Sequence, residues 1–157
     1  MAKFQMGLPD DLIKEFQKLE KTSHKMLEEM TQAGAEVVYK NVKDNMKSSF
    51  KDSDKLAKYL KITKSYTTPS DGGVNTKVAF YGYYKEDEKT FSLTSKSGKK
   101  YSYKGIPVPL IIRAREFGSS SGEAKKPFFR KSFKKSQIEK EMLKVQDKYL
   151  KEMEWIV

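Results

Sequence analysis

Cysteine and histidine, which often perform catalysis or bind metals, are nearly absent from this sequence. It contains no cysteine and a single histidine, His24. Disulfides, thiolate nucleophiles, cysteine metal sites and histidine metal cages are therefore excluded. His24 stands near an expected helix start, between Ser23 and Lys25, and we interpret it as an exposed or capping residue.

Carboxylates are the remaining candidates for chemistry, and their spacing favours a structural role. The pairs Asp10-Asp11 and Glu28-Glu29 are adjacent, so on a helix the two side chains diverge by about 100°. Asp52, Asp54, Asp71 and the triplet 86–88 lack the spacing of a calcium loop. The segment from Gly118 to Lys126 also lacks the spacing of a phosphate-binding loop. We therefore expect no metal, no cofactor and no enzymatic activity.

The charge of the chain is strongly positive and unevenly spread. Its 157 residues include 32 Lys+Arg and 21 Asp+Glu, which gives a net charge of +11. The excess is zero over residues 1–50, +6 over 51–104 and +5 over 105–157. A local surplus of lysine favours contact with phosphates, whereas an even mixture of signs indicates a solvated face or a subunit contact.

Two helices are expected in the N-terminal third. Asp10 and Asp11 mark the start of a short helix whose apolar residues are Leu12, Phe16 and Leu19. Thr22 or Ser23 is predicted to cap a second, longer helix that ends near Ser48. Its apolar and small residues recur at spacings of three and four: Met26, Leu27, Met30, Ala33, Gly34, Val37, Val38, Asn41, Val42 and Met46.

The middle of the chain shows the alternation of β-strands. Residues 62–68 and 74–84 flank the turn at 69–73 and predict a hairpin. Its aromatic run 80–84 is interpreted mainly as core, with base stacking as the alternative. A second, polar pair at 90–94 and 100–104 predicts an arm, residues 85–104, that projects from the domain. Four lysines of this arm are candidates for facing DNA or docking on a partner: Lys96, Lys99, Lys100 and Lys104.

The last third predicts a short helix that ends at Gly118, a polar loop at 119–126, and a final helix that opens at Pro127. The fold class is α+β: N-terminal amphipathic helices, a small antiparallel sheet with a protruding polar hairpin, and a long C-terminal helix. We expect one domain over residues 1–157. Its core is predicted to join the sheet with Met30, Val37, Val38, Phe129 and Phe133.

A spaced pair of motifs gives the chain a family resemblance. Glu116-Phe117-Gly118 followed by Pro127-Phe128-Phe129-Arg130, with an earlier turn at Leu56 to Leu60, resembles the gene-ten-like tail-component family of long-tailed bacteriophages. The similarity extends over about residues 8–150. Ser119 stands where a threonine commonly follows the glycine, and the hairpin at 90–104 looks like an elaboration.

The resemblance implies a structural protein at the head-tail junction, a neck or tail-completion ring through which DNA passes. The implied partners are other copies of the chain, neighbouring head-completion and tail proteins, and phage DNA bound without sequence preference, with no membrane. The implied location is the virion, assembled in the cytoplasm of a bacterial host. The interface candidates are Glu116, Phe117, Gly118, Pro127, Phe128, Phe129 and Arg130.

Two other functions remain open at this point. The first is a basic nucleic-acid-binding domain without catalytic activity, and the second is a metal-dependent nuclease. Arg130 also has two possible partners: Glu116 of the same chain, or an acid on a neighbouring subunit. In either case we expect Phe117, Phe128 and Phe129 to gather at the corner between the two C-terminal helices.

Overall fold

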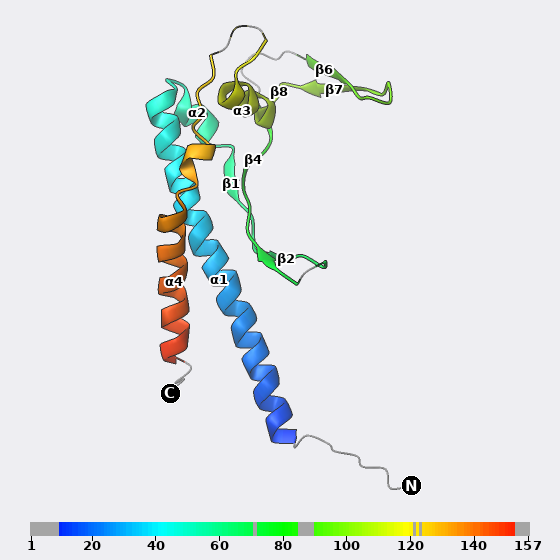
Figure 1. Cartoon of the computed structure of the whole chain (residues 1–157). Helices are drawn as coiled ribbons and strands as arrows, with labels where there is room; N and C mark the ends of the chain where they lie inside the picture. The colour runs from blue at the N-terminus through cyan, green and yellow to red at the C-terminus, as the bar shows by residue number, and fades with distance from the viewer. Residues whose placement is uncertain (1–9, 71, 85–89, 121, 123, 153–157) are drawn as a thin grey trace.

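A long helix with a shorter antiparallel partner forms one side of the molecule (Figure 1). The structure is a computed structural model that describes residues 10–152, except for 71, 85–89, 121 and 123. Helix α1, Asp10–Ser49, has 40 residues, and α4, Lys135–Glu152, lies beside it. The predicted mixed α+β class is confirmed.

The expected break at Thr22 is wrong, because α1 passes through it as one continuous helix. The Thr22 hydroxyl donates a hydrogen bond to the carbonyl of Lys18, at 2.9 Å. A threonine that bonds to the carbonyl one turn earlier is compatible with a helix interior. No proline lies within α1, so nothing in its sequence forces the chain to leave the helix.

Helices α1 and α4 approach each other closely at Gly34. A Cβ atom at this position would lie 3.1 Å from Cγ2 of Ile138 and 3.3 Å from Cγ of Met142. Nearer the end of α4, Tyr149 is buried. Burial and a hydrogen bond with Glu29 raise the pKa of the Tyr149 phenol to about 12.

Within the described residues, the strands form antiparallel pairs, as predicted, but in four separate two-stranded ladders. After the short helix α2, Ser53–Ala57, β1 and β4 pair with Leu60 opposite Phe80, and β2 and β3 extend the same hairpin. The bounds are Leu60–Ile62 for β1, Tyr66–Thr67 for β2, Val74–Asn75 for β3 and Val78–Phe80 for β4.

The expected strand at 74–84 is divided at Gly82, whose φ of 94° lies in the left-handed region. Beyond it, β5, Tyr83–Tyr84, pairs with β8, Ile106–Pro107. Between them, β6, Thr90–Thr94, pairs with β7, Lys100–Lys104, and Figure 1 shows this pair extending away from the helices. The bounds of β6 and β7 agree with the prediction.

The hydrophobic core lies where the C-terminal half of α1 meets α2, the β1/β4 pair and α3, Val108–Phe117. Its buried members are Val38, Val42, Met46, Leu56, Leu60, Phe80, Val108, Ile112 and Phe128. Val38 was predicted correctly. Met30 and Val37 are only half-buried, and Phe133 is 52% exposed, so its predicted core position is wrong.

The final helix does not open at Pro127. A short 3-10 turn, η1, spans Arg130–Ser132, and α4 begins at Lys135. Phe133, between the two, has a non-helical ψ of 74°. The segment after Pro127 turns because its backbone amides bond to a side chain of α3.

Candidate functional site: the α3 corner and the β6–β7 hairpin

Glu116 is the centre of the corner between α3 and η1. It occupies the last turn of α3, and the residue is only 3% exposed. Its Oε2 accepts hydrogen bonds from the backbone amides of Phe128, at 2.8 Å, and Phe129, at 2.9 Å. Its Oε1 accepts the Arg130 amide at 3.3 Å and Arg130 Nε at 3.1 Å. The carboxylate thus accepts hydrogen bonds from three consecutive backbone amides that have no acceptor within a helix.

These hydrogen bonds determine the ionisation of Glu116. Burial by itself would raise its pKa, because it disfavours the charged form. The amides of Phe129 and Phe128, together with Arg130, outweigh that effect and hold the pKa below its usual value. Glu116 is therefore a charged group inside the fold, and its anion is what orders residues 128–130.

Arg130 pairs with Glu116 of its own chain, one of the two alternatives left open by the sequence. Its side chain remains 57% exposed, and its guanidinium lies 4.7 Å from the centre of the Phe117 ring. Phe117 is itself 55% exposed. Arg130 and Phe117 therefore form the outward-facing part of the corner.

The three phenylalanines do not gather as expected. Phe128 points into the core, where its ring is 5.1 Å from that of Phe50 and 6.5 Å from that of Phe80. Phe129 packs against Phe80 and Phe133, at 6.0 and 5.4 Å. Phe117 stays outside, because it follows Glu116 at the end of α3 and lies on a different face.

A second ion pair anchors the same end of α3. Arg115 donates from Nη1 to Asp52 Oδ1 at 2.7 Å and from Nη2 to Asp52 Oδ2 at 2.6 Å. The Arg115 guanidinium also lies 4.8 Å from the ring centre of Phe50. Its hydrogen bond holds the pKa of Asp52 below the usual value. The sequence did not reveal this pair, because 63 residues separate the two partners.

Asparagine side chains of α1 donate hydrogen bonds to the far side of the corner, and the sequence analysis also missed these bonds. Asn45 Nδ2 donates to Ser132 Oγ at 2.8 Å and to the Phe128 carbonyl at 3.3 Å. Asn41 Nδ2 donates to the Ser132 carbonyl at 3.1 Å. Asn41 was predicted to lie on the apolar stripe of α1, and an amide in such a stripe is a signal for a partner across the core.

Gly118 and Pro127 delimit the loop of the corner. Gly118 has a φ of 83°, as a glycine that ends a helix requires. Pro127 is half-buried next to the Glu116-bound amides. These two residues shape the chain and offer no side-chain chemistry.

The hairpin lysines lie apart from this corner. Lys96 and Lys99 are in the turn that joins β6 to β7, where the Ser95 amide donates to the Lys99 carbonyl at 2.9 Å. Lys100 and Lys104 are in β7, opposite Thr94 and Thr90. Since their spacing is four residues, they share one face of the strand. All four lysines are exposed.

His24 has an acid partner that the sequence analysis did not assign. Its Nδ1 lies 3.6 Å from Glu28 Oε1, one helical turn away, and its Nε2 lies 3.1 Å from the Thr67 hydroxyl on β2. His24 is exposed, as one of the two interpretations expected, but it is not a helix cap and it has partners. It links α1 to the end of the hairpin.

The described residues hold no group of three or more histidine, aspartate or glutamate side chains that could bind a metal ion. Among them, no helix combines the length and the apolar character needed to cross a membrane. Asp71 and the acidic triplet 86–88, weighed above as possible ligands, lie outside the described residues.

One family model matches the chain, over residues 10–103, and is described as "Bacteriophage HK97-gp10, putative tail-component". No curated protein and no solved structure matches the chain. The matched segment covers α1 and the strands through most of β7. It includes the turn at Leu56 to Leu60 and nearly all of the hairpin at 90–104, which looks like an elaboration in the sequence. It does not include the corner motifs from Glu116 onward.

Proposed function

Because this chain belongs to the HK97-gp10-like family of bacteriophage tail components, we propose that it is a structural assembly protein of the head-tail junction. In this role it forms part of a neck or tail-completion ring through which the genome passes. The family match over residues 10–103 is the observation that carries the proposal. The proposed assembly partners are further copies of the chain, neighbouring head-completion and tail proteins, and phage DNA.

The geometry narrows the surfaces available for such contacts. Of the corner residues named as interface candidates, Glu116 and Phe128 are buried within the subunit. Phe117 and Arg130 are exposed and stacked on each other. We therefore restrict the proposed partner contact at the corner to these two, and assign the other candidates to shaping the chain.

The hairpin is the second proposed contact. It carries Lys96, Lys99, Lys100 and Lys104 on an extension with no acid in its described strands or turn. A cationic extension of this kind suits the phosphate backbone of DNA, which is bound without sequence preference. It also suits an acidic surface of a neighbouring protein.

Charge bears on how the proposed ring would form. Each copy carries +11, so closing a ring of several copies brings like charges together. We expect the isolated protein to be monomeric at low concentration and low salt, and to assemble on a partner or around DNA. Light scattering at increasing salt tests this, and a stable ring of the pure protein at low salt would contradict it.

Deletion of the gene from the phage tests the proposed role. If the protein acts at the junction, infected cells should accumulate DNA-filled heads and separate tails, visible by electron microscopy. Expression of the protein from a plasmid should restore joined particles. Joined particles of normal yield in its absence would overturn the proposal, and tails of altered length with normal joining would move the protein away from the junction.

A further inference from the structure

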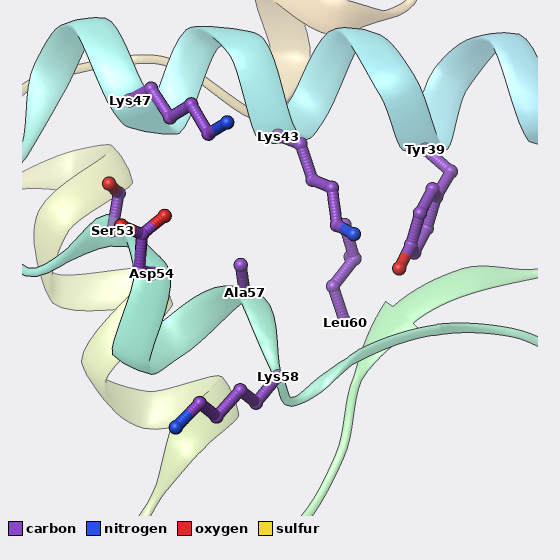
Figure 2. Close-up of a pocket in the computed structure, with 8 residues that line it drawn as sticks. All are labelled: Tyr39, Lys43, Lys47, Ser53, Asp54, Ala57, Lys58 and Leu60. Atoms are coloured by element: carbon purple, nitrogen blue, oxygen red, sulfur yellow. The ribbon is translucent and has the colours of Figure 1, made fainter.

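A hollow lined by lysines lies between α1, α2 and β1, away from both contacts discussed above. Its volume is about 330 Å³, and its lining residues are Tyr39, Lys43, Lys47, Ser53, Asp54, Ala57, Lys58 and Leu60. In Figure 2, Lys43 extends from α1 toward Leu60, Lys47 lies along α1, and the carboxylate of Asp54 points from the start of α2 toward α1. Lys58 lines the hollow at the end of α2, and its side chain points away from Lys43 and Lys47.

Among the described residues, the lysines of this hollow lack the carboxylate partners that several other lysines of the helices have. On the rest of α1 and on α4, Lys25, Lys135, Lys144 and Lys148 each pair with a glutamate three or four residues away. Within the described part of the chain, Lys43, Lys47 and Lys58 form no ion pair. Lys43 instead lies 4.5 Å from the ring centre of Tyr39.

This arrangement is unfavourable for the isolated subunit. Lys43 and Lys47 are one turn apart on the same helix, and like charges at that spacing destabilise a helix slightly. Asp54 supplies one negative charge against the two positive charges of Lys43 and Lys47. A concave surface with an uncompensated charge concentrates the field and attracts a counter-charge.

We propose that this hollow binds an acidic side chain from a segment of a neighbouring protein. Its volume is at the lower limit for a ligand pocket, which suits one or two side chains. Leu60, Ala57 and the Tyr39 ring provide apolar walls for the methylene groups of a glutamate, while Lys43 and Lys47 supply its counter-charges.

A DNA backbone is the less suitable occupant. Duplex DNA needs cations that extend over a broad surface to meet a row of phosphates. Here Asp54, beside Ser53, also lines the hollow, and its carboxylate would repel a polyanion at close range. The exposed lysines of the β6–β7 hairpin meet the requirement for DNA better.

The test uses hexaglutamate as the probe and follows backbone amide shifts of the full-length protein by NMR. Hexaglutamate should shift the amides of Lys43, Lys47, Ser53 and Asp54. The double variant Lys43→Gln/Lys47→Gln should weaken binding at least tenfold. The matched control Lys18→Gln/Lys21→Gln removes the same charge from exposed positions of the same helix and should change the affinity less than twofold.

Asp54→Asn gives the opposite expectation. Since it removes the only acid of the hollow, binding of hexaglutamate should become severalfold tighter. The double variant Lys43→Gln/Lys47→Gln is predicted to melt at or slightly above the temperature of the unchanged protein, because it removes two like charges one turn apart without touching the core. Asp54→Asn is predicted to melt slightly below it, because Asp54 is an acid in the first turn of α2.

Three results would overturn the inference. One is equal weakening by the two double variants, which would show attraction by net charge alone. Another is that inorganic phosphate at matched charge competes fully, which would make the hollow a site for small anions only. The last is that a short DNA duplex shifts the hollow amides more than hexaglutamate does.

Discussion

Glu116 at the α3 corner and Lys100 on the β6–β7 hairpin are both charged, yet their surroundings are opposite. Glu116 is 3% exposed and accepts four hydrogen bonds from residues 128–130. Lys100 is exposed on a strand that pairs with one other strand. A charged group that is hydrogen-bonded inside the fold stabilises the fold, whereas a charged group exposed on the surface is available to a partner.

This comparison changes how the corner motif is understood. The spaced motif from Glu116 to Arg130 is conspicuous in the sequence and invites a functional interpretation. In the structure, most of its side chains order the chain itself. The polar hairpin offers more exposed surface for a partner, although its sequence contains no motif beyond its lysines.

The largest expected effect comes from placing a charge in the hydrophobic core, to which Phe128 of the corner belongs and the described side chains of the hairpin do not. Val38 is 4% exposed in the centre of that core. Val38→Asp should lower the free energy of unfolding by about 4 kcal/mol, because it buries an unpaired carboxylate. Val37→Asp, at a half-buried neighbouring position, is the control and should cost clearly less. Equal urea midpoints for the two variants would show that α1 does not use this face for the core.

Glu116→Gln should have the next largest effect, about 2 kcal/mol at pH 7, because hydrogen bonds to a charged acceptor are stronger than those to an amide. The pKa of Glu116 is lower in the fold than its ordinary value of 4.5. Its contribution is therefore complete above about pH 4.5 and is lost as the pH falls through the lower folded pKa.

Urea unfolding between pH 7 and pH 3 measures this contribution. The unchanged protein should lose more stability over that range than Glu116→Gln does. The variant keeps the acid dependence of Asp52, whose pKa is also lowered. Parallel pH profiles for the two proteins would mean that the carboxylate is not ionised in the corner.

Arg130→Ala should cost at most about 1 kcal/mol, since its side chain is 57% exposed and solvent weakens the pair with Glu116. The melting temperature and the yield of joined particles distinguish its possible roles. A small drop in melting temperature with normal joining would limit Arg130 to the subunit. Impaired joining with little change in melting temperature would support the proposed partner contact, and normal values in both would remove Arg130 from the interface.

The smallest effect on stability is expected from replacing residues 90–104 with a short Gly-Ser turn. A polar two-stranded hairpin contributes little on its own, so the melting temperature and cooperativity should stay the same. Circular dichroism checks this directly. Loss of the folded state would place the hairpin among the elements that hold the core.

Local patterns predicted much of this fold, and non-local contacts account for what they missed. The hairpin strands Thr90–Thr94 and Lys100–Lys104 were predicted with their exact bounds, because alternation and a glycine-containing turn are local signals. The end of α3 at Gly118 was likewise predicted. The start of α4 was not, because Glu116 competes with the helix for the amides of residues 128–130.

Non-local contacts also explain which residues of the site could not be predicted from the sequence. Asp52 and Arg115 meet across 63 residues, and neither has a neighbour that points to the other. Asn45 and Ser132 are similarly remote. The family was identified from the corner and the turn at Leu56 to Leu60, and the family match covers only the second of these.

The central claim is that the hairpin serves assembly, while the corner, apart from the proposed partner contact at Phe117 and Arg130, serves folding. The most direct test complements the gene-deleted phage with the protein that carries the Gly-Ser turn in place of residues 90–104, and counts joined particles by electron microscopy. We predict a folded protein that leaves DNA-filled heads and tails separate. Joined particles at the level of the unchanged protein would contradict the claim.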